Sequence, residues 1–178
     1  KFLAGNYTLT HGQGLIFYGG LGELVRPVKI KTVGAEADYT GGNNEYLKGV
    51  HFGHRFGLFS AEAFVSQKAL DLRVSTVTGV VSEDVNALRD SIGDIQSERD
   101  LLDNDSVLER LYGGRLAYQS QDWNVGATGY SAGYSRLIDP DETRYSFSHV
   151  FRGDRSRVMG LDFDYRFSPL NIFGEAAL

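Results

Sequence analysis

The sequence predicts an all-β fold, an antiparallel up-and-down β-barrel of the transmembrane type, of which this chain forms a partial barrel. Apolar and polar residues alternate with the two-residue period of a β-strand over many segments. The 178 residues include 22 Gly, 10 Tyr and 11 Phe but only 3 Pro, which is typical of many strands joined by turns. We treat residues 1–178 as a single β-barrel region, because the length suits one domain.

The alternation is clearest near the end of the chain. Leu161 and Phe163 share one face, and Asp162, Asp164 and Arg166 share the other. Several of the predicted strands exceed the usual ~5–6 residues and suit a tilted membrane-spanning strand of ~9–11 residues. We expect nine strands, near residues 1–10, 28–40, 45–56, 58–74, 110–121, 122–137, 143–153, 156–167 and 169–178.

The predicted connections differ sharply in length. Residues 76–109 form a long loop that we place outside the membrane, and the segment from Thr76 to Arg110 carries nine acidic residues and three Arg. This loop is predicted to be partly helical, since Ser97–Asp100 and Ser106–Glu109 resemble capping boxes. With nine alternating strands, the tight Ser168-Pro169 turn falls on the side of the long loop, so one strand is miscounted or one outer loop is short.

The Gly-rich segment 11–27 interrupts the alternation near the start of the chain. Glycine permits sharp changes of backbone direction, so this segment is predicted to be an irregular turn or a plug folded into the barrel.

Composition excludes several classes of function. No basic stripe indicates a nucleic-acid surface, and the absence of Cys excludes disulfides and Cys-zinc sites. No apolar run approaches the ~18–20 residues of a membrane helix. Gly12-Gln13-Gly14 is too short for a phosphate loop, and no nucleophile motif is present. We therefore expect no enzymatic activity, no cofactor and no metal site that the sequence identifies.

Alternation alone does not say which face meets solvent. The polar faces combine Gly with charges of both signs, which suits a crowded, wet interior. Aromatic residues gather near strand ends, where membrane barrels carry interfacial girdles. Both features favour apolar residues facing lipid. The charged residues that we expect to line the lumen are Arg55, Glu62, Arg115, Asp162, Asp164, Arg166 and Glu175.

The lumen charges have two interpretations. They could filter ions or polar solutes, as rings of charge do in pores, or they could neutralise one another and fill the interior. In the acidic loop, Asp100, Asp103, Asp105 and Glu109 are candidate weak contacts for divalent cations, although their spacing does not follow an EF-hand. A solvated acidic loop is the simpler alternative.

The four histidines are predicted to be isolated interior or interfacial residues. His51 and His54 are three apart on a predicted strand, so they face opposite sides and do not share a metal ion.

These patterns predict a non-enzymatic outer-membrane barrel that serves as a porin-like pore, an uptake channel or a surface scaffold. Its partners would be outer-membrane lipid and small polar solutes or ions. The alternative is a soluble all-β binding module that recognises a partner through the acidic loop 76–109. That alternative requires Leu161, Phe163 and Phe167 to be buried in a core.

Several short motifs, in order along most of the chain, resemble one bacterial family. The motifs are Gly5-Asn6-Tyr7, Gly12-Gln13-Gly14-Leu15, Phe17-Tyr18, Leu47-Lys48-Gly49-Val50, Glu109-Arg110-Leu111-Tyr112-Gly113-Gly114-Arg115-Leu116, Asp162-Phe163-Asp164-Tyr165-Arg166 and Phe173-Gly174-Glu175-Ala176-Ala177. They are similar to the outer-membrane β-barrel region of helix-hairpin-helix domain-containing proteins. The resemblance implies an outer-membrane barrel, located in the bacterial outer membrane, and it does not imply an enzyme activity.

The chain also departs from that family. No helix-hairpin-helix segment is recognisable, so DNA binding is not implied for this segment. Lys48 stands where the family has Arg, and His11 stands where it has an aromatic residue. Leu178 is not the terminal aromatic residue typical of outer-membrane barrels, so we expect an internal fragment whose barrel needs further strands to close.

Overall fold

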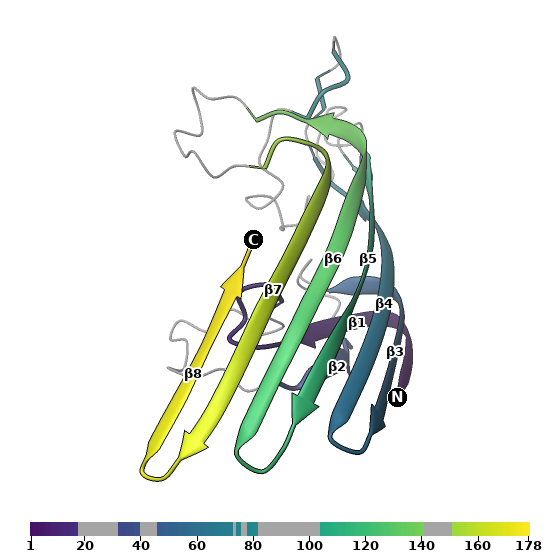
Figure 1. Ribbon diagram of the computed structural model, residues 1–178. Coiled ribbons are helices and arrows are strands. Elements are labelled where there is room, and N and C mark those ends of the chain that lie inside the picture. The colour runs from purple at the N-terminus through teal and green to yellow at the C-terminus, as the bar shows by residue number, and fades with distance from the viewer. Residues whose placement is uncertain (18–31, 40–45, 73, 76–77, 82–103, 141–150) are drawn as a thin grey trace.

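In the computed structural model the chain forms one antiparallel sheet, curled into a half-barrel (Figure 1). The structure describes residues 1–17, 32–39, 46–72, 74–75, 78–81, 104–140 and 151–178. The spatial order is β2-β1-β3-β4-β5-β6-β7-β8, so from β3 onward each strand pairs with the next one along the chain. The strands are β1 (Phe2–Thr10), β2 (Gly34–Ala37), β3 (Leu47–Phe56), β4 (Phe59–Leu70), β5 (Val107–Gln119), β6 (Trp123–Ile138), β7 (Gly153–Phe167) and β8 (Leu170–Ala177).

The connections divide between the two ends of the sheet. Tight turns join β3 to β4, β5 to β6 and β7 to β8 at one end, which we call the turn end. The β4–β5 and β6–β7 connections leave from the opposite end, the loop end. Because β6 pairs directly with β7, the Ser168-Pro169 turn lies at the turn end with the other tight turns. The conflict in the nine-strand count therefore came from a miscounted strand.

The alternation of the sequence becomes two distinct faces. On the concave face, Tyr7, Leu9, Phe64 and Leu111 form a buried apolar cluster with Ala35 and Ala132. A second cluster lies at the loop end and consists of Leu72, Val81, Val107 and Ile138. The convex face carries exposed large apolar side chains, among them Phe52, Val65, Leu116, Val125, Met159, Leu161, Phe163 and Ile172.

The structure corrects several predicted strand boundaries. Eight strands are described rather than nine, and residues 143–150 of the predicted strand 143–153 lie outside the described residues. Of the predicted strand 28–40, the described residues 32–39 contain β2 at Gly34–Ala37, and residues 28–31 and 40 lie outside the described residues. The predicted strand 58–74 ends at Leu70, where pairing with β5 stops at Val107.

The long acidic loop also ends earlier than predicted. The prediction of a capping box at Ser106–Glu109 is wrong, because Val107 begins β5 and its side chain is buried in the loop-end cluster. The Ser106 hydroxyl donates to the carbonyl of Leu72 at 2.6 Å and accepts from its N–H at 3.2 Å. Cross-strand bonds therefore replace the expected helix cap. The other predicted capping box, Ser97–Asp100, lies outside the described residues.

All elements in the described part of the chain are strands. No helix within these residues is long and apolar enough to cross a membrane.

Candidate functional site

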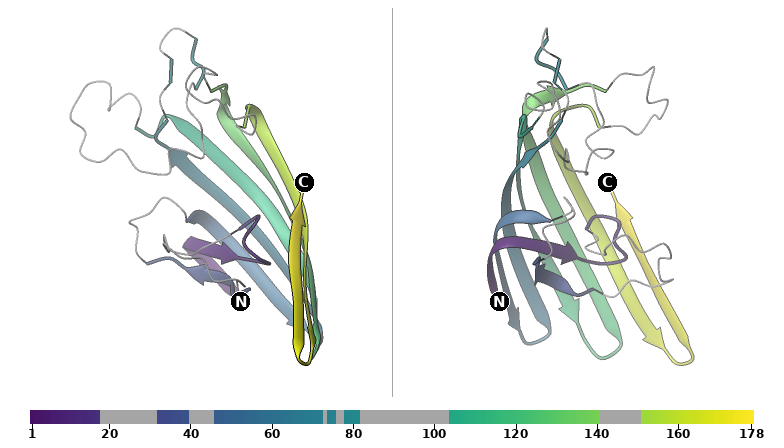
Figure 2. Two further views of the ribbon diagram at one scale, coloured as in Figure 1. Left: turned by 90° about the vertical axis from the view of Figure 1, so that its left-hand side faces the viewer. Right: turned by 180° about the vertical axis from the view of Figure 1, so that it is seen from behind.

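The N-terminal strand directs the chain across the concave face. The first part of β1 pairs with β3, from Phe2 with Phe52 to Tyr7 with Leu47. Its last part pairs with β2, from Tyr7 with Ala37 to Thr10 with Gly34. Figure 2 shows β1 and β2 on the concave side of the longer strands. The chain therefore leaves the wall of the half-barrel after Tyr7 and enters its interior.

The residues that follow β1, 11–17, form a compact segment that we call the strap. A turn closes it, since the N–H of Gly14 donates to the carbonyl of His11 at 3.0 Å. The N–H groups of Gln13 and Leu15 both donate to Oε2 of Glu175 on β8, at 2.7 and 2.9 Å. Hydrogen bonds to a charged acceptor are stronger than neutral ones, so Glu175 holds the strap against β8.

Apolar contacts hold the other side of the strap. Phe17 meets the ring of Phe64 on β4 edge to face, with centroids 5.4 Å apart. It also lies 5.0 Å from the ring of Tyr130 on β6. A Cβ added at Gly160 on β7 would lie 2.4 Å from Cδ1 of Ile16. The strap thus contacts β4, β6, β7 and β8, and it fills the space in front of them.

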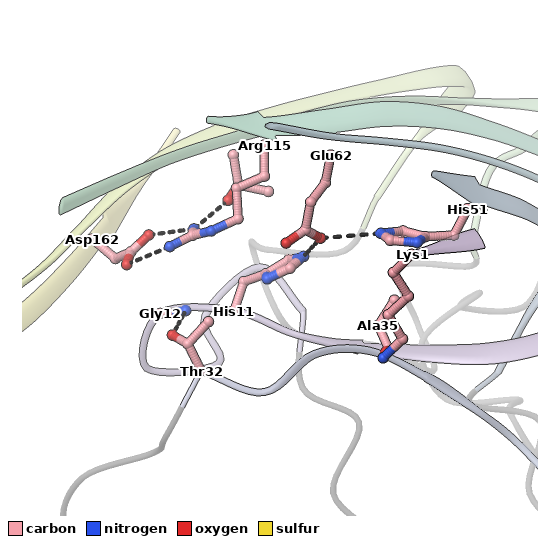
Figure 3. Close-up of polar contacts among 10 residues, drawn as sticks. Lys1, His11, Gly12, Thr32, Ala35, His51, Glu62, Arg115 and Asp162 are labelled. Atoms are coloured by element: carbon pink, nitrogen blue, oxygen red, sulfur yellow. Dashed lines mark hydrogen bonds and ion pairs between the residues drawn. The ribbon is translucent and has the colours of Figure 1, made fainter. Parts of the chain in front are cut away.

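Beneath the strap, Arg115 and Asp162 form a buried ion pair across three strands (Figure 3). Both terminal nitrogens of the Arg115 guanidinium group donate to the Asp162 carboxylate, Nη1 to Oδ2 at 2.5 Å and Nη2 to Oδ1 at 2.8 Å. Nη1 also donates to the hydroxyl of Thr128 on the intervening β6, at 2.7 Å. Arg115 is 4% exposed and Asp162 6% exposed, so each charge depends on the other in a site that water barely reaches.

The backbone of β6 leaves room for this pair at Gly126. A Cβ at that position would lie 2.0 Å from Nη2 of Arg115 and 2.6 Å from Oδ2 of Asp162. The glycine therefore permits the guanidinium group to lie flat over β6 and reach β7. Gly12 of the strap packs against the side chain of Asp162, and a Cβ added at Gly12 would lie 2.8 Å from Cβ of Asp162.

A second charged group lies toward β3, where Glu62 stands between two buried histidines (Figure 3). Its Oε2 lies 3.1 Å from Nε2 of His51 and 3.5 Å from Nε2 of His11. Burial lowers the pKa of His11 to about 4, an effect that the Glu62 carboxylate opposes only in part. His11 is therefore neutral at pH 7.

The predicted lumen residues fall into two groups. The structure brings Glu62, Arg115, Asp162 and Glu175 together around the strap. The remaining three residues lie nearer the turn end. Arg55 is exposed, and its Nε donates to the carbonyl of Gly57 at 3.3 Å. Asp164 and Arg166 line a depression of about 60 Å³ beside the Ser120–Trp123 turn.

The predicted cation contacts of the acidic loop are not brought together in the described structure. Asp100 and Asp103 lie outside the described residues. Glu109 belongs to β5, opposite Lys68 of β4, and Asp105 lies in a turn where its N–H donates to Asp71. Within the described residues no group of three His, Asp or Glu side chains is placed to hold a metal ion.

Sequence reasoning missed the contribution of the histidines and of Thr128. His51 is buried and His54 exposed, as their spacing predicted, but His11 and His51 share one carboxylate rather than standing apart. The only sequence signal was the Gly-rich pattern after His11, which indicated an irregular segment and not its partner. The His11–Glu62 contact joins residues 51 positions apart, and it depends on how the strap crosses the sheet. The His51–Glu62 and Arg115–Thr128 contacts instead cross the β3–β4 and β5–β6 hairpins.

Comparison of the chain with protein-family models, with curated proteins and with solved structures found no match. The arrangement of the two faces therefore carries the functional argument.

Proposed function

We propose that the chain forms the wall of a membrane-spanning β-barrel in a bacterial outer membrane, with the strap and the buried charged groups filling its polar interior. The protein acts as a transmembrane scaffold, or as a restricted channel for small polar solutes or ions, and not as an enzyme. The observation that carries the proposal is the inversion of the usual burial pattern, in which charges are buried on one face and large apolar side chains are exposed on the other.

Three residues distinguish the membrane wall from a soluble sandwich. A sandwich would bury Leu161, Phe163 and Phe167, but they are 63, 42 and 59% exposed. An exposed apolar face of this extent is a liability in water, and it is the normal outer surface of a barrel in lipid. The exposure therefore supports the membrane alternative.

Aromatic side chains form a belt on the convex face at the turn end. Trp123 stacks on Tyr165 with centroids 4.1 Å apart, and Phe59 lies 5.2 Å from Tyr118. Phe56 continues the belt onto β3, with its ring 6.1 Å from that of Phe59. Such belts lie at the membrane–water interface, where an aromatic ring meets both headgroups and acyl chains.

The height of the apolar surface fits a bilayer. On β7 the outward residues from Met159 to Phe167 are apolar or aromatic and extend about 27 Å along the strand at about 3.4 Å per residue. A tilt of about 40° reduces this to a height of about 21 Å, close to the ~25 Å apolar band of outer-membrane barrels.

The edges of the sheet set one further requirement. Lipid offers no hydrogen bonds to an open strand edge, so a membrane sheet must close. Among the described residues, the outer edge of β8 has no partner strand. The proposal therefore includes strands beyond the eight described ones that complete the barrel.

The only Trp of the chain provides a direct test. We expect Trp123 fluorescence to be quenched most by lipids brominated near the headgroup when the chain is folded into vesicles. In a Trp123→Phe/Leu161→Trp variant, quenching should be strongest with bromine deep in the acyl chain. Heat-modifiable migration in detergent should accompany both results. Stable, monomeric β structure in plain buffer, without quenching by any brominated lipid, would contradict the proposal.

A further inference from the structure

A groove crosses the convex face at the loop end, above the apolar band. It has a volume of about 470 Å³ and is lined by β5, β6 and β7. The floor is made by the small residues Gly133 and Ser131 of β6. Arg110 and Tyr112 of β5 form one wall, and Arg155 and Arg157 of β7 form the other.

The strand register brings these side chains together. Arg110 pairs with Gly133, which pairs in turn with Arg155, so two arginines flank one glycine at the same level. One step toward the apolar band, Ser131 lies between Tyr112 and Arg157. The groove therefore results from small residues on the middle strand between long ones on its neighbours.

The charges of the groove are not neutralised within the described part of the chain. No ion pair or hydrogen bond involves the guanidinium groups of Arg110, Arg155 or Arg157 there, and all three residues are exposed. Asp154 is the one carboxylate among the lining residues. The Arg115 of the interior, by contrast, has its matched carboxylate at 2.5 Å.

The arginines of the groove are charged residues on the convex face, which is otherwise mainly apolar along β7. From Met159 to the turn end, the outward residues of β7 are apolar or aromatic, and the groove begins where this band stops. In a barrel with its apolar band in lipid, the groove lies at the level of the lipid headgroups.

We infer that this groove binds the phosphate-bearing headgroup of a membrane lipid. The inference rests on the proposed membrane function, because only an inserted barrel presents the groove to headgroups. Guanidinium groups bind phosphate through paired N–H donors, and arginines on both walls approach a headgroup from two sides. The ring of Tyr112 faces the start of the acyl chains, and the serine hydroxyls of the groove add neutral donors.

The probe is the chain in detergent micelles titrated with phosphatidic acid, with phosphatidylcholine as the zwitterionic reference. Native mass spectrometry counts the lipids retained on the folded protein. We expect preferential retention of one phosphatidic acid molecule. Arg155→Gln should weaken this retention about fivefold and Arg155→Gln/Arg157→Gln about 25-fold, because each basic residue near an anionic headgroup contributes about 1 kcal/mol.

Two further variants separate the groove from general positive charge. Lys48→Gln removes a cation from the same convex face outside the groove and should leave retention unchanged. Gly133→Val keeps all three arginines but fills the floor, and its Cβ meets only the carbonyl of Asp154 at 4.0 Å. We expect this substitution to reduce retention as strongly as the double arginine change.

The outcomes distinguish this inference from the proposed function. Retention that does not respond to the groove variants, while Trp123 still reports insertion into lipid, overturns the groove alone. An equimolar amount of inorganic phosphate should not displace the lipid, and displacement would identify a free-phosphate site instead. A chain that never inserts overturns both proposals.

Discussion

The concave and convex faces of the sheet are built by alternate residues of the same strands, yet their charged side chains differ in burial and pairing. On the concave face, Arg115 and Asp162 are buried and joined by two hydrogen bonds. On the convex face, the arginines of the groove are exposed and gathered at one end. The chain itself therefore pairs Arg115 with Asp162 on the concave face, whereas the proposed function assigns the convex face to lipid.

The largest expected effect comes from breaking the concave pair. Asp162→Ala leaves Arg115 buried without its carboxylate, and loss of one partner of a buried pair costs about 3–5 kcal/mol. The free energy of unfolding in detergent, measured by urea titration, should fall by that amount. Arg166→Gln, on the same strand and face but exposed at the turn end, should change it by less than about 0.5 kcal/mol. Equal effects of the two substitutions would show that the interior pair is not desolvated.

The convex face gives a smaller effect that depends on the solvent. Leu161→Arg should destabilise the chain by about 2–4 kcal/mol in a bilayer, and Leu170→Arg by only about 0–1 kcal/mol, because the cost falls from the midplane to the interface. Unfolding in lipid vesicles, followed by circular dichroism, measures both variants. If the two substitutions cost the same, Leu161 does not lie deeper in the bilayer than Leu170.

Acid should weaken the attachment of the strap. The pKa of His11 is lowered to about 4 in the folded chain, below its value of about 6.5 when unfolded, so the unfolded state takes up the proton first. The resulting stability is present above pH 6.5 and is lost as pH falls toward 4, by up to about 3 kcal/mol.

The charged groups facing His11 are Glu62, His51, Arg115 and Asp162, and they remain in His11→Gln. The difference in unfolding free energy between the native chain and this variant should therefore change over that pH interval, as measured by urea titration at several pH values. A constant difference would mean that His11 is solvated.

Most of the contrast between the two faces could be predicted from the sequence. The period-two pattern predicted the all-β class and placed Asp162 and Leu161 on opposite sides, and the structure confirms both. The pairing of β3 with β4, and of β5 with β6, follows from their tight turns. Strand boundaries were less predictable, since Val107 resembled a helix start until its cross-strand partner Leu70 was known.

Only part of the candidate site could be predicted from the sequence. Charged side chains on a polar face could be identified as inward residues, because their orientation follows from a local alternation. The contact between Glu175 and the strap could not, because it joins residues about 160 positions apart. Such a contact depends on β1 leaving β3 at Tyr7 and turning inward.

The sequence by itself determined the class of fold and which residues share the polar and the apolar face of each strand. Side chains alternate between the two faces along a strand, so this assignment depends only on neighbouring residues. The tertiary structure alone decided which inward charges are paired and which outward arginines share a groove. Those partners lie on different strands, and strand register together with the path of the strap brings them within reach.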